Sequence, residues 1–121
     1  MPTVEGPIKT MTLGDRDLLI SVSGELDLHT VGDLENALDE AIAEEHEHIV
    51  VDLSDVSFVD SIALSVLAKS SRRLREIGGS LGVTTTNPEI VRPFEITGLD
   101  RLIPLERSVT ELLERLDRAR R

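Results

Sequence analysis

Segments with strand-like and helix-like hydrophobic patterns alternate along this chain of 121 residues. Residues 17–23, 48–53 and 81–85 are rich in β-branched and apolar side chains, which is typical of strands. Between them, apolar residues recur at helical spacing. Strands that alternate with helices usually pair in parallel, so the order predicts an α/β fold. We expect one domain over residues 1–121, with a mostly parallel sheet of four to five strands, alternating helices, and frayed tails at 1–8 and 118–121.

Glycines and polar residues predict where the strands end. A strand at 8–13 is expected to form a hairpin with 17–23 through Gly14 and Asp15. The second strand should stop at Gly24. The run 48–53 is the expected central strand, and residues 54–60 after it have a turn-rich composition. Residues 102–105 could form a last short strand.

Capping residues predict where the helices begin and end. Thr30 stands at the expected N-cap of the first helix, with Asp33 three residues later. A second helix is expected over 61–77, before a glycine pair. A short third helix should lie between Asn87 and Gly98. Ser108 and the glutamate three residues later predict a final helix, whose apolar stripe is Val109, Leu112, Leu113, Leu116 and Ala119.

The composition excludes several kinds of partner. Thirteen Lys and Arg against 23 Asp and Glu give a formal net charge of −10, which repels nucleic acid and anionic lipid. The basic runs 69–75 and 115–121 have acidic neighbours and are interpreted as solvated helix faces. Cysteine is absent, which excludes disulfides and thiolate sites, and no apolar run is long enough to cross a bilayer. We therefore expect a cytoplasmic protein without direct contact to nucleic acid or membrane.

The reactive residues do not form a catalytic or metal motif. No glycine-rich phosphate loop precedes a helix, and no nucleophile has a base at a suggestive spacing. His29 is interpreted as a loop residue that could orient a nearby carboxylate. His46 and His48 could share a metal, but no third ligand stands at a telling spacing, so both are expected at a solvated strand entry. We expect no catalytic residue, metal or cofactor, and hence not an enzyme.

Two carboxylates stand where strands are expected to end. Asp27 follows the first good strand, and Asp60 comes immediately before the second long helix. Ligands and partners of open α/β sheets bind at the carboxyl ends of the strands, so the two residues are expected near each other. Asp60 either only caps the helix or also takes part in recognition. Ser61, next in the chain, would lie beside unpaired backbone N–H groups that favour a phosphate.

Four motifs in this order resemble those of the STAS domain. They are Gly24-Glu-Leu-Asp27, Ile49-Val-Val-Asp-Leu53, Val56-Ser-Phe-Val-Asp-Ser61 and Phe94-Glu-Ile-Thr-Gly-Leu99. The resemblance covers about residues 14–116 and is strongest to the bacterial anti-sigma factor antagonists. It implies a STAS-like fold and partner switching. Such a protein binds an anti-sigma factor and so releases a sigma factor. The anti-sigma factor is itself a serine kinase with a histidine-kinase-like ATPase fold. Phosphorylation by that kinase ends the binding, and a serine phosphatase restores it.

The chain departs from the family pattern at the phosphorylated position. The family has Asp-Ser-Ser/Thr-Gly-Leu and is modified on the second hydroxyl residue, where this chain has Ile62, followed by Ala63 in place of glycine. Three interpretations remain: no phosphorylation, which we prefer; phosphorylation of Ser61; or phosphorylation of Ser65, expected to face inward. Ile62 is either part of a protein interface or part of the core. The resemblance and the position of the turn together predict a partner-binding set: Asp27, Asp60, Ser61, Ile62, Ala63 and Leu64.

Two other functions compete with the antagonist. One is a non-catalytic STAS subunit of a lipid-transport or stress-signalling assembly, in which the same surface would be a permanent interface. The other is a small enzyme or nucleotide-binding domain, which the missing phosphate loop disfavours.

Overall fold

Five strands form one sheet in the computed structural model, which describes residues 7–119. The strands are β1 (Ile8–Leu13), β2 (Asp17–Leu26), β3 (His48–Val59), β4 (Ser80–Thr84) and β5 (Leu105–Glu106), and they lie in the sheet in chain order. β1 pairs antiparallel with β2, and each later pair is parallel. The structure thus confirms the α/β fold with a mostly parallel sheet.

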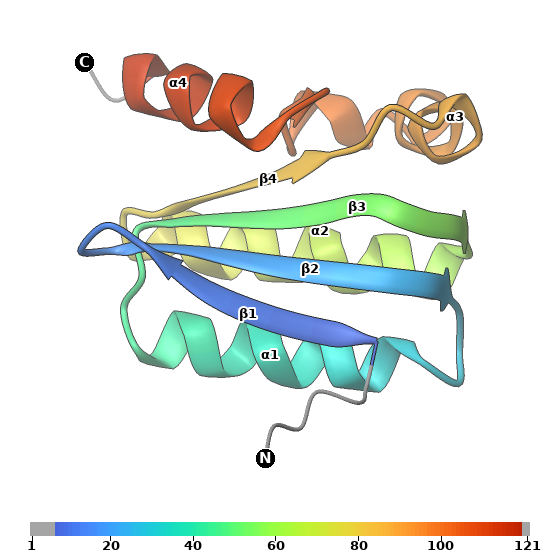
Figure 1. Ribbon diagram of the computed structural model, residues 1–121, viewed down its shortest axis with the longest axis horizontal. Coiled ribbons are helices and arrows are strands. Elements are labelled where there is room, and N and C mark those ends of the chain that lie inside the picture. The colour runs from blue at the N-terminus through green and yellow to red at the C-terminus, as the bar shows by residue number, and fades with distance from the viewer. Residues whose placement is uncertain (1–6, 120–121) are drawn as a thin grey trace.

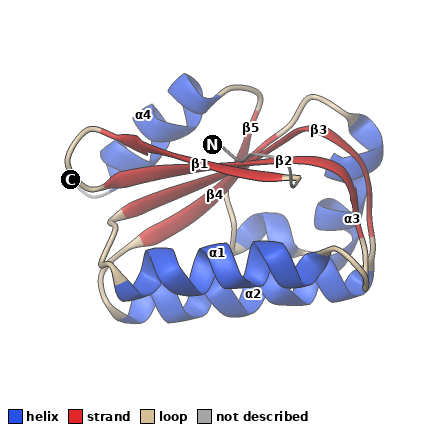
Figure 2. Ribbon diagram, turned by 60° about the horizontal axis from the view of Figure 1, so that its bottom comes forward, coloured by secondary structure: helices blue, strands red, loops and turns tan. Residues whose placement is uncertain are grey.

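The helices form a layer on each side of the sheet. α1 (Val31–Ala43) and α2 (Ser61–Glu76) lie side by side on one face, and α4 (Val109–Ala119) crosses the other (Figures 1 and 2). α3 (Pro88–Thr97), followed by a 3₁₀ turn at Leu99–Arg101, lies at the end where β2 and β3 terminate. The main core lies between α1, α2 and the sheet. A smaller cluster under α4 contains Val50, Leu112 and Leu116.

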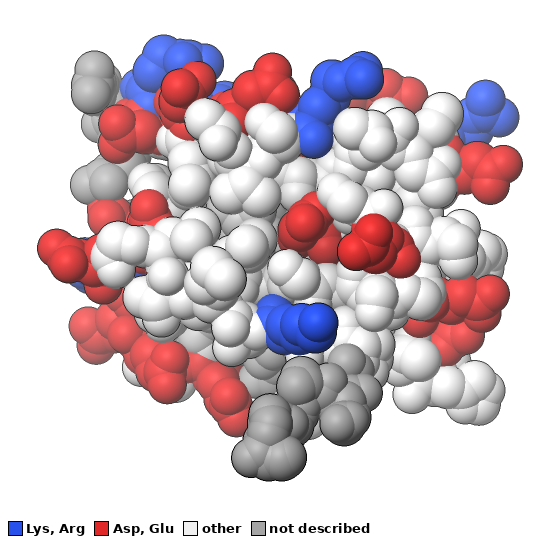
Figure 3. Space-filling model, in the orientation of Figure 1, with Lys and Arg blue, Asp and Glu red and all other residues white. Residues whose placement is uncertain are grey.

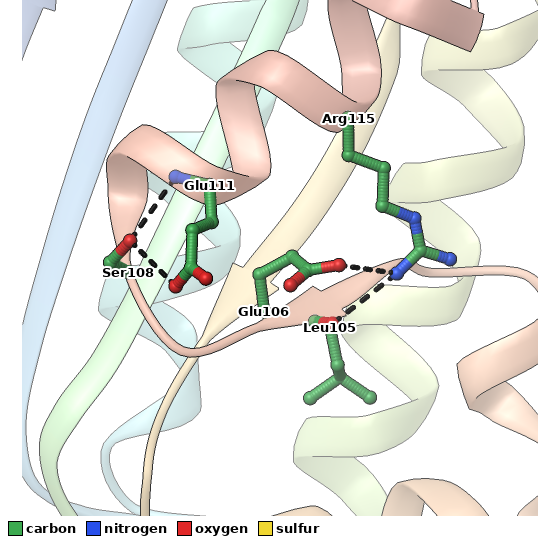
Figure 4. A network of polar contacts seen from close by, with 5 residues as sticks. All are labelled: Leu105, Glu106, Ser108, Glu111 and Arg115. Carbon is green, nitrogen blue, oxygen red and sulfur yellow. Dashed lines mark hydrogen bonds and ion pairs between the residues drawn. The ribbon is translucent and has the colours of Figure 1, made fainter.

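The ends of the later helices follow the expected capping chemistry. Asn87 Oδ1 accepts the Glu89 N–H at 3.0 Å at the start of α3, and Gly98 ends that helix with a left-handed φ of 78°. Ser108 Oγ accepts the Glu111 N–H at 3.1 Å and bonds its carboxylate at 3.0 Å (Figure 4). In the same view Arg115 bonds Glu106 at 2.9 Å and the Leu105 carbonyl at 3.3 Å. These contacts fix the start of α4 against β5.

Two strands are longer than their sequence patterns indicate. β2 does not stop at Gly24 but continues to Leu26, with Gly24 at a φ of 90° and a register shift beside it. The supposed turn-rich stretch 54–60 is mostly strand, because β3 runs to Val59. Its apolar residues Val56 and Val59 are buried, and it pairs with the end of β2. Tertiary pairing here overrides a turn-like composition.

Smaller differences concern the chain ends and the last strand. β1 begins at Ile8, and α4 continues through residues 118–119, so regular structure reaches into both expected tails. Residues 1–6 and 120–121 lie outside the described residues. Ala119 is exposed and does not extend the apolar stripe of α4. The last strand lies at 105–106 and not at 102–105, because the N–H groups of Leu102 and Ile103 bond back to the Leu99 carbonyl of the 3₁₀ turn.

Surface charges pair across neighbouring helices. Arg73 bonds Asp39 at 2.6 Å and Lys69 lies 4.0 Å from Glu35, which joins α2 to α1 and agrees with solvated faces. Acidic side chains gather at the lower left of Figure 3, around the end of the sheet where α1 ends and β3 begins. Among residues 7–119, no helix is long and apolar enough to cross a membrane.

Gly82 allows α4 to pack closely on the sheet. A Cβ atom at this position would lie 2.6 Å from Leu112 Cδ1, and Leu112 is fully buried. We expect Gly82→Ala to lower the free energy of unfolding by about 1–3 kcal/mol through overpacking. Urea unfolding followed by circular dichroism measures the change. Gly32→Ala is the control: a Cβ atom there would meet no other atom within 4 Å, so helix propensity should raise stability by about 0.5 kcal/mol. Equal stability of Gly82→Ala and the native chain would contradict this packing.

Candidate functional site

The last residues of β2 and β3 bring the two expected carboxylates together. Leu26 is the register partner of Val59, and the Asp60 N–H donates to the Leu26 carbonyl at 3.1 Å. Asp27 and Asp60 therefore follow neighbouring strand ends. We call this region, residues 27–30 and 58–62, the docking edge. It lies at the right of Figure 1, where the arrowheads of β2 and β3 end.

Asp60 caps α2. Its backbone is extended, and its Oδ1 accepts the Ala63 N–H at 2.9 Å. A carboxylate here satisfies one of the open N–H groups and complements the positive end of the helix dipole. The cap uses one carboxylate oxygen, so the other oxygen can still contact a partner.

Asp27 organises the loop before α1. Its Oδ1 accepts the His29 N–H at 2.9 Å and the Thr30 N–H at 3.2 Å. The Thr30 hydroxyl accepts the Asp27 N–H at 3.0 Å and donates to the Glu25 carbonyl at 2.6 Å. Thr30 is thus the N-cap residue, as expected, but its hydroxyl makes no capping bond to α1. The expected pairing with Asp33 is replaced by the loop that Asp27 holds.

The first turn of α2 divides into exposed and buried residues. Ser61 is exposed and Ile62 is 40% exposed, which excludes the interpretation of Ile62 as core. Ala63 and Leu64 are 0% and 7% exposed, so they mainly support the turn from below. Their place in the partner-binding set stays a prediction.

Ser65 does not face inward, contrary to the expectation. It is exposed, one helical turn beyond Ser61, because the adjacent buried face is formed by Ala63, Leu64, Val66 and Leu67. Burial therefore does not separate Ser61 from Ser65 as substrates of a kinase. The difference between them is position: Ser61 is the first residue of the helix, and Ser65 lies in its second turn.

Exposed apolar side chains concentrate around the docking edge. Six large hydrophobic residues are strongly exposed in the described chain: Met11, Leu28, Phe58, Ile62, Ile77 and Ile96. Leu28, Phe58 and Ile62 belong to the edge itself, and Ile96 lies on α3 at the same end of the sheet. Sequence reasoning missed Leu28 and Phe58, because nothing in their immediate pattern shows whether a single apolar residue faces the core. Exposed apolar residues gathered at one end favour a protein-binding surface.

None of the three histidine rings is bonded to a residue in the first turn of α2. His29 holds the Asp27 carboxylate with its N–H and not with its ring. The His46 ring lies 3.3 Å from Glu44. His48 was expected at a solvated strand entry, and this is wrong: it is 5% exposed, because β3 has a neighbour on both sides from its first residue.

Comparison with known proteins identifies the family. The sequence model of the STAS domain family matches residues 9–112. This chain belongs to the STAS domain family. The match includes all of the docking edge and every strand apart from the first residue of β1.

Named relatives of this STAS domain are anti-sigma factor antagonists. It is 33% identical over 101 residues to the anti-sigma F factor antagonist of Paenibacillus polymyxa, covering 83% of this chain and 86% of that protein. It is 34% identical over 98 residues to the anti-sigma-F factor antagonist RsfB of Mycobacterium tuberculosis, covering 79% and 80%. A crystal structure of an anti-sigma factor antagonist from Mycobacterium paratuberculosis superposes with a TM-score of 0.81 at 32% identity, covering 96% and 99% of the two chains.

Two substitutions of Asp60 separate the contribution of its capping hydrogen bond to stability from that of its negative charge. Asp60→Ala should lower the free energy of unfolding by about 1 kcal/mol, because the Ala63 N–H loses its acceptor. Asp60→Asn keeps an oxygen in place and should cost less than half as much. Urea titrations of both variants provide the measurement. A loss in Asp60→Asn as large as that in Asp60→Ala would show that the charge, and not the cap, stabilises the turn.

Proposed function

We propose that this STAS domain is an anti-sigma factor antagonist, which binds an anti-sigma factor through the docking edge and so releases a sigma factor. One observation carries the proposal: Ile62 is exposed on the first turn of α2, next to Asp60, the acidic residue that caps this helix. An exposed isoleucine at this position is explained by contact with a partner. The names of the relatives support the kind of partner.

A binding role agrees with the chemistry of the docking edge better than catalysis does. Asp60 Oδ1 is committed to the helix cap, and the hydrogen bonds of the described residues place no base on the Ser61 hydroxyl. The proposed partner has a histidine-kinase-like ATPase fold. It would meet this protein in the cytoplasm, without contact to nucleic acid or membrane.

Phosphorylation of the edge is a separate part of the proposal. Ile62 has no hydroxyl, so a serine kinase cannot modify the position used by the family. We expect incubation with the cognate kinase and ATP to leave the chain unmodified or to place phosphate on Ser61, the exposed first residue of α2. Mass spectrometry of the protein locates the phosphate. Phosphate on Ser65 or on any other serine or threonine would contradict the expectation. A serine phosphatase is a partner only if Ser61 is modified.

Affinity purification from the native cell tests the proposed partner. The native chain should recover an anti-sigma factor, and phosphosite mapping of the recovered protein reads its modification state. Recovery of transporter components, in place of an anti-sigma factor, would favour the lipid-transport alternative and contradict the proposal.

A further inference from the structure

We propose that Asp17, Glu47 and His48 form a binding site for a divalent transition-metal ion, with zinc as the best match. One ring nitrogen of His48 and one carboxylate oxygen from each acidic residue lie within 4.8 Å of one another. Asp17 and His48 are the first residues of β2 and β3, and Glu47 immediately precedes β3, at the end of the sheet opposite the docking edge. The inference therefore does not rest on the proposed function.

His48 is the residue that points to a ligand. Its side chain is buried, yet the described residues offer no hydrogen-bond partner to Nε2. A buried polar atom without a partner costs about 1–3 kcal/mol, so it needs an explanation. A metal ion bound to the Nε2 lone pair supplies one.

The second ring nitrogen of His48 is held as in known metal sites. Nδ1 lies 2.8 Å from Ser80 Oγ on the neighbouring strand β4. In the tautomer in which Nδ1 donates to Ser80, Nε2 presents its lone pair for coordination. Histidines that bind metals usually donate their other N–H to a nearby acceptor in this way, which fixes both tautomer and ring orientation.

The register of the sheet places the carboxylates. Asp17 is the direct register partner of His48 on β2, and in a parallel pair such residues point to the same face. Glu47 immediately precedes His48, and both carboxylates are half-buried. A tetrahedral zinc with bonds of about 2.0–2.2 Å holds its ligands roughly 3.4 Å apart, so modest side-chain rotations close the site. Three protein ligands leave the fourth position to water.

The choice of metal follows from the ligands and the surrounding charge. Imidazole nitrogen with two carboxylates suits zinc and its neighbours, whereas magnesium and calcium prefer oxygen ligands alone. Acidic side chains gather at this end of the molecule (Figure 3) and favour a cation, although Arg16, Arg75 and Arg101 line the hollows beside Glu47 and His48. Zinc bound here would join β2 to β3 and stabilise the native state.

Isothermal titration of the untagged, full chain with zinc chloride tests the site. We expect one zinc ion per chain and a rise in melting temperature of roughly 5 °C at saturation. His48→Gln and Asp17→Asn should each weaken zinc binding at least about tenfold. Magnesium chloride should give neither binding heat nor a comparable shift.

Two matched variants separate the site from general charge effects. Asp15→Asn removes the same charge from an exposed position in the adjoining turn, and His46→Ala removes the neighbouring histidine. Both should bind zinc like the native chain. Because His48 is buried and its variant could fail to fold, Asp17→Asn alone is sufficient to decide. No zinc binding, equal binding in Asp17→Asn, an equal loss in His46→Ala or an equal response to magnesium would each overturn the proposal.

Discussion

Replacing Ser61 with glutamate is expected to weaken binding of the cognate anti-sigma factor about 100-fold, which corresponds to about 2.8 kcal/mol. Ser61 is exposed beside Asp60 and Asp27, so the new carboxylate would be a third negative charge at the docking edge. Burying it in an interface that fits an uncharged side chain at position 61 leaves a charge without a partner, which is costly. Biolayer interferometry with the purified anti-sigma factor measures the change.

The fold should survive this substitution. Glutamate in the first turn of a helix interacts favourably with the dipole, and α2 has no acidic residue there. Ser61→Ala is the matched control and should bind like the native chain, because it removes the hydroxyl without adding charge. Undiminished binding of Ser61→Glu would show that Ser61 lies outside the interface.

Ile62→Ala is expected to weaken the same complex roughly 30-fold, or about 2 kcal/mol, as for a central interface residue. Ile62 is 40% exposed, so its truncation removes little from the core. Ile77 supplies a control of the same residue type: it is 56% exposed at the C-terminal end of α2. Ile77→Ala should bind normally. Equal effects of the two substitutions would show that the docking edge has no special role.

Periodicity predicts much of this fold because the core is regular. The stripes of α1 and α2 and the apolar run at the start of β3 bury the expected residues, including Leu34, Leu67 and Val51. The later part of β3 is different. It contains Ser54, Asp55 and Ser57 on exposed positions, and it becomes strand only because β2 is there to pair with it. Such long-range pairing is not visible in a local pattern.

The sequence predicts which residues lie side by side at the docking edge, but not which way the side chains around them point. Strand ends and a helix start place Asp27, Asp60 and Ser61 together, which the register of β2 and β3 confirms. The outward direction of Ser65 depends on how α2 packs on the sheet, and the burial of His48 depends on the strands that pair with β3 on both sides. Residue type alone carries no information about either.

Release of a sigma factor is the most direct test of the proposed function. A preformed complex of the cognate anti-sigma factor with a fluorescent sigma factor is titrated with this protein, and free sigma is measured by anisotropy. The account predicts that the native chain releases sigma as its concentration approaches that of the anti-sigma factor, and that Ser61→Glu does not. An intact complex in a large excess of the native chain would contradict the antagonist function.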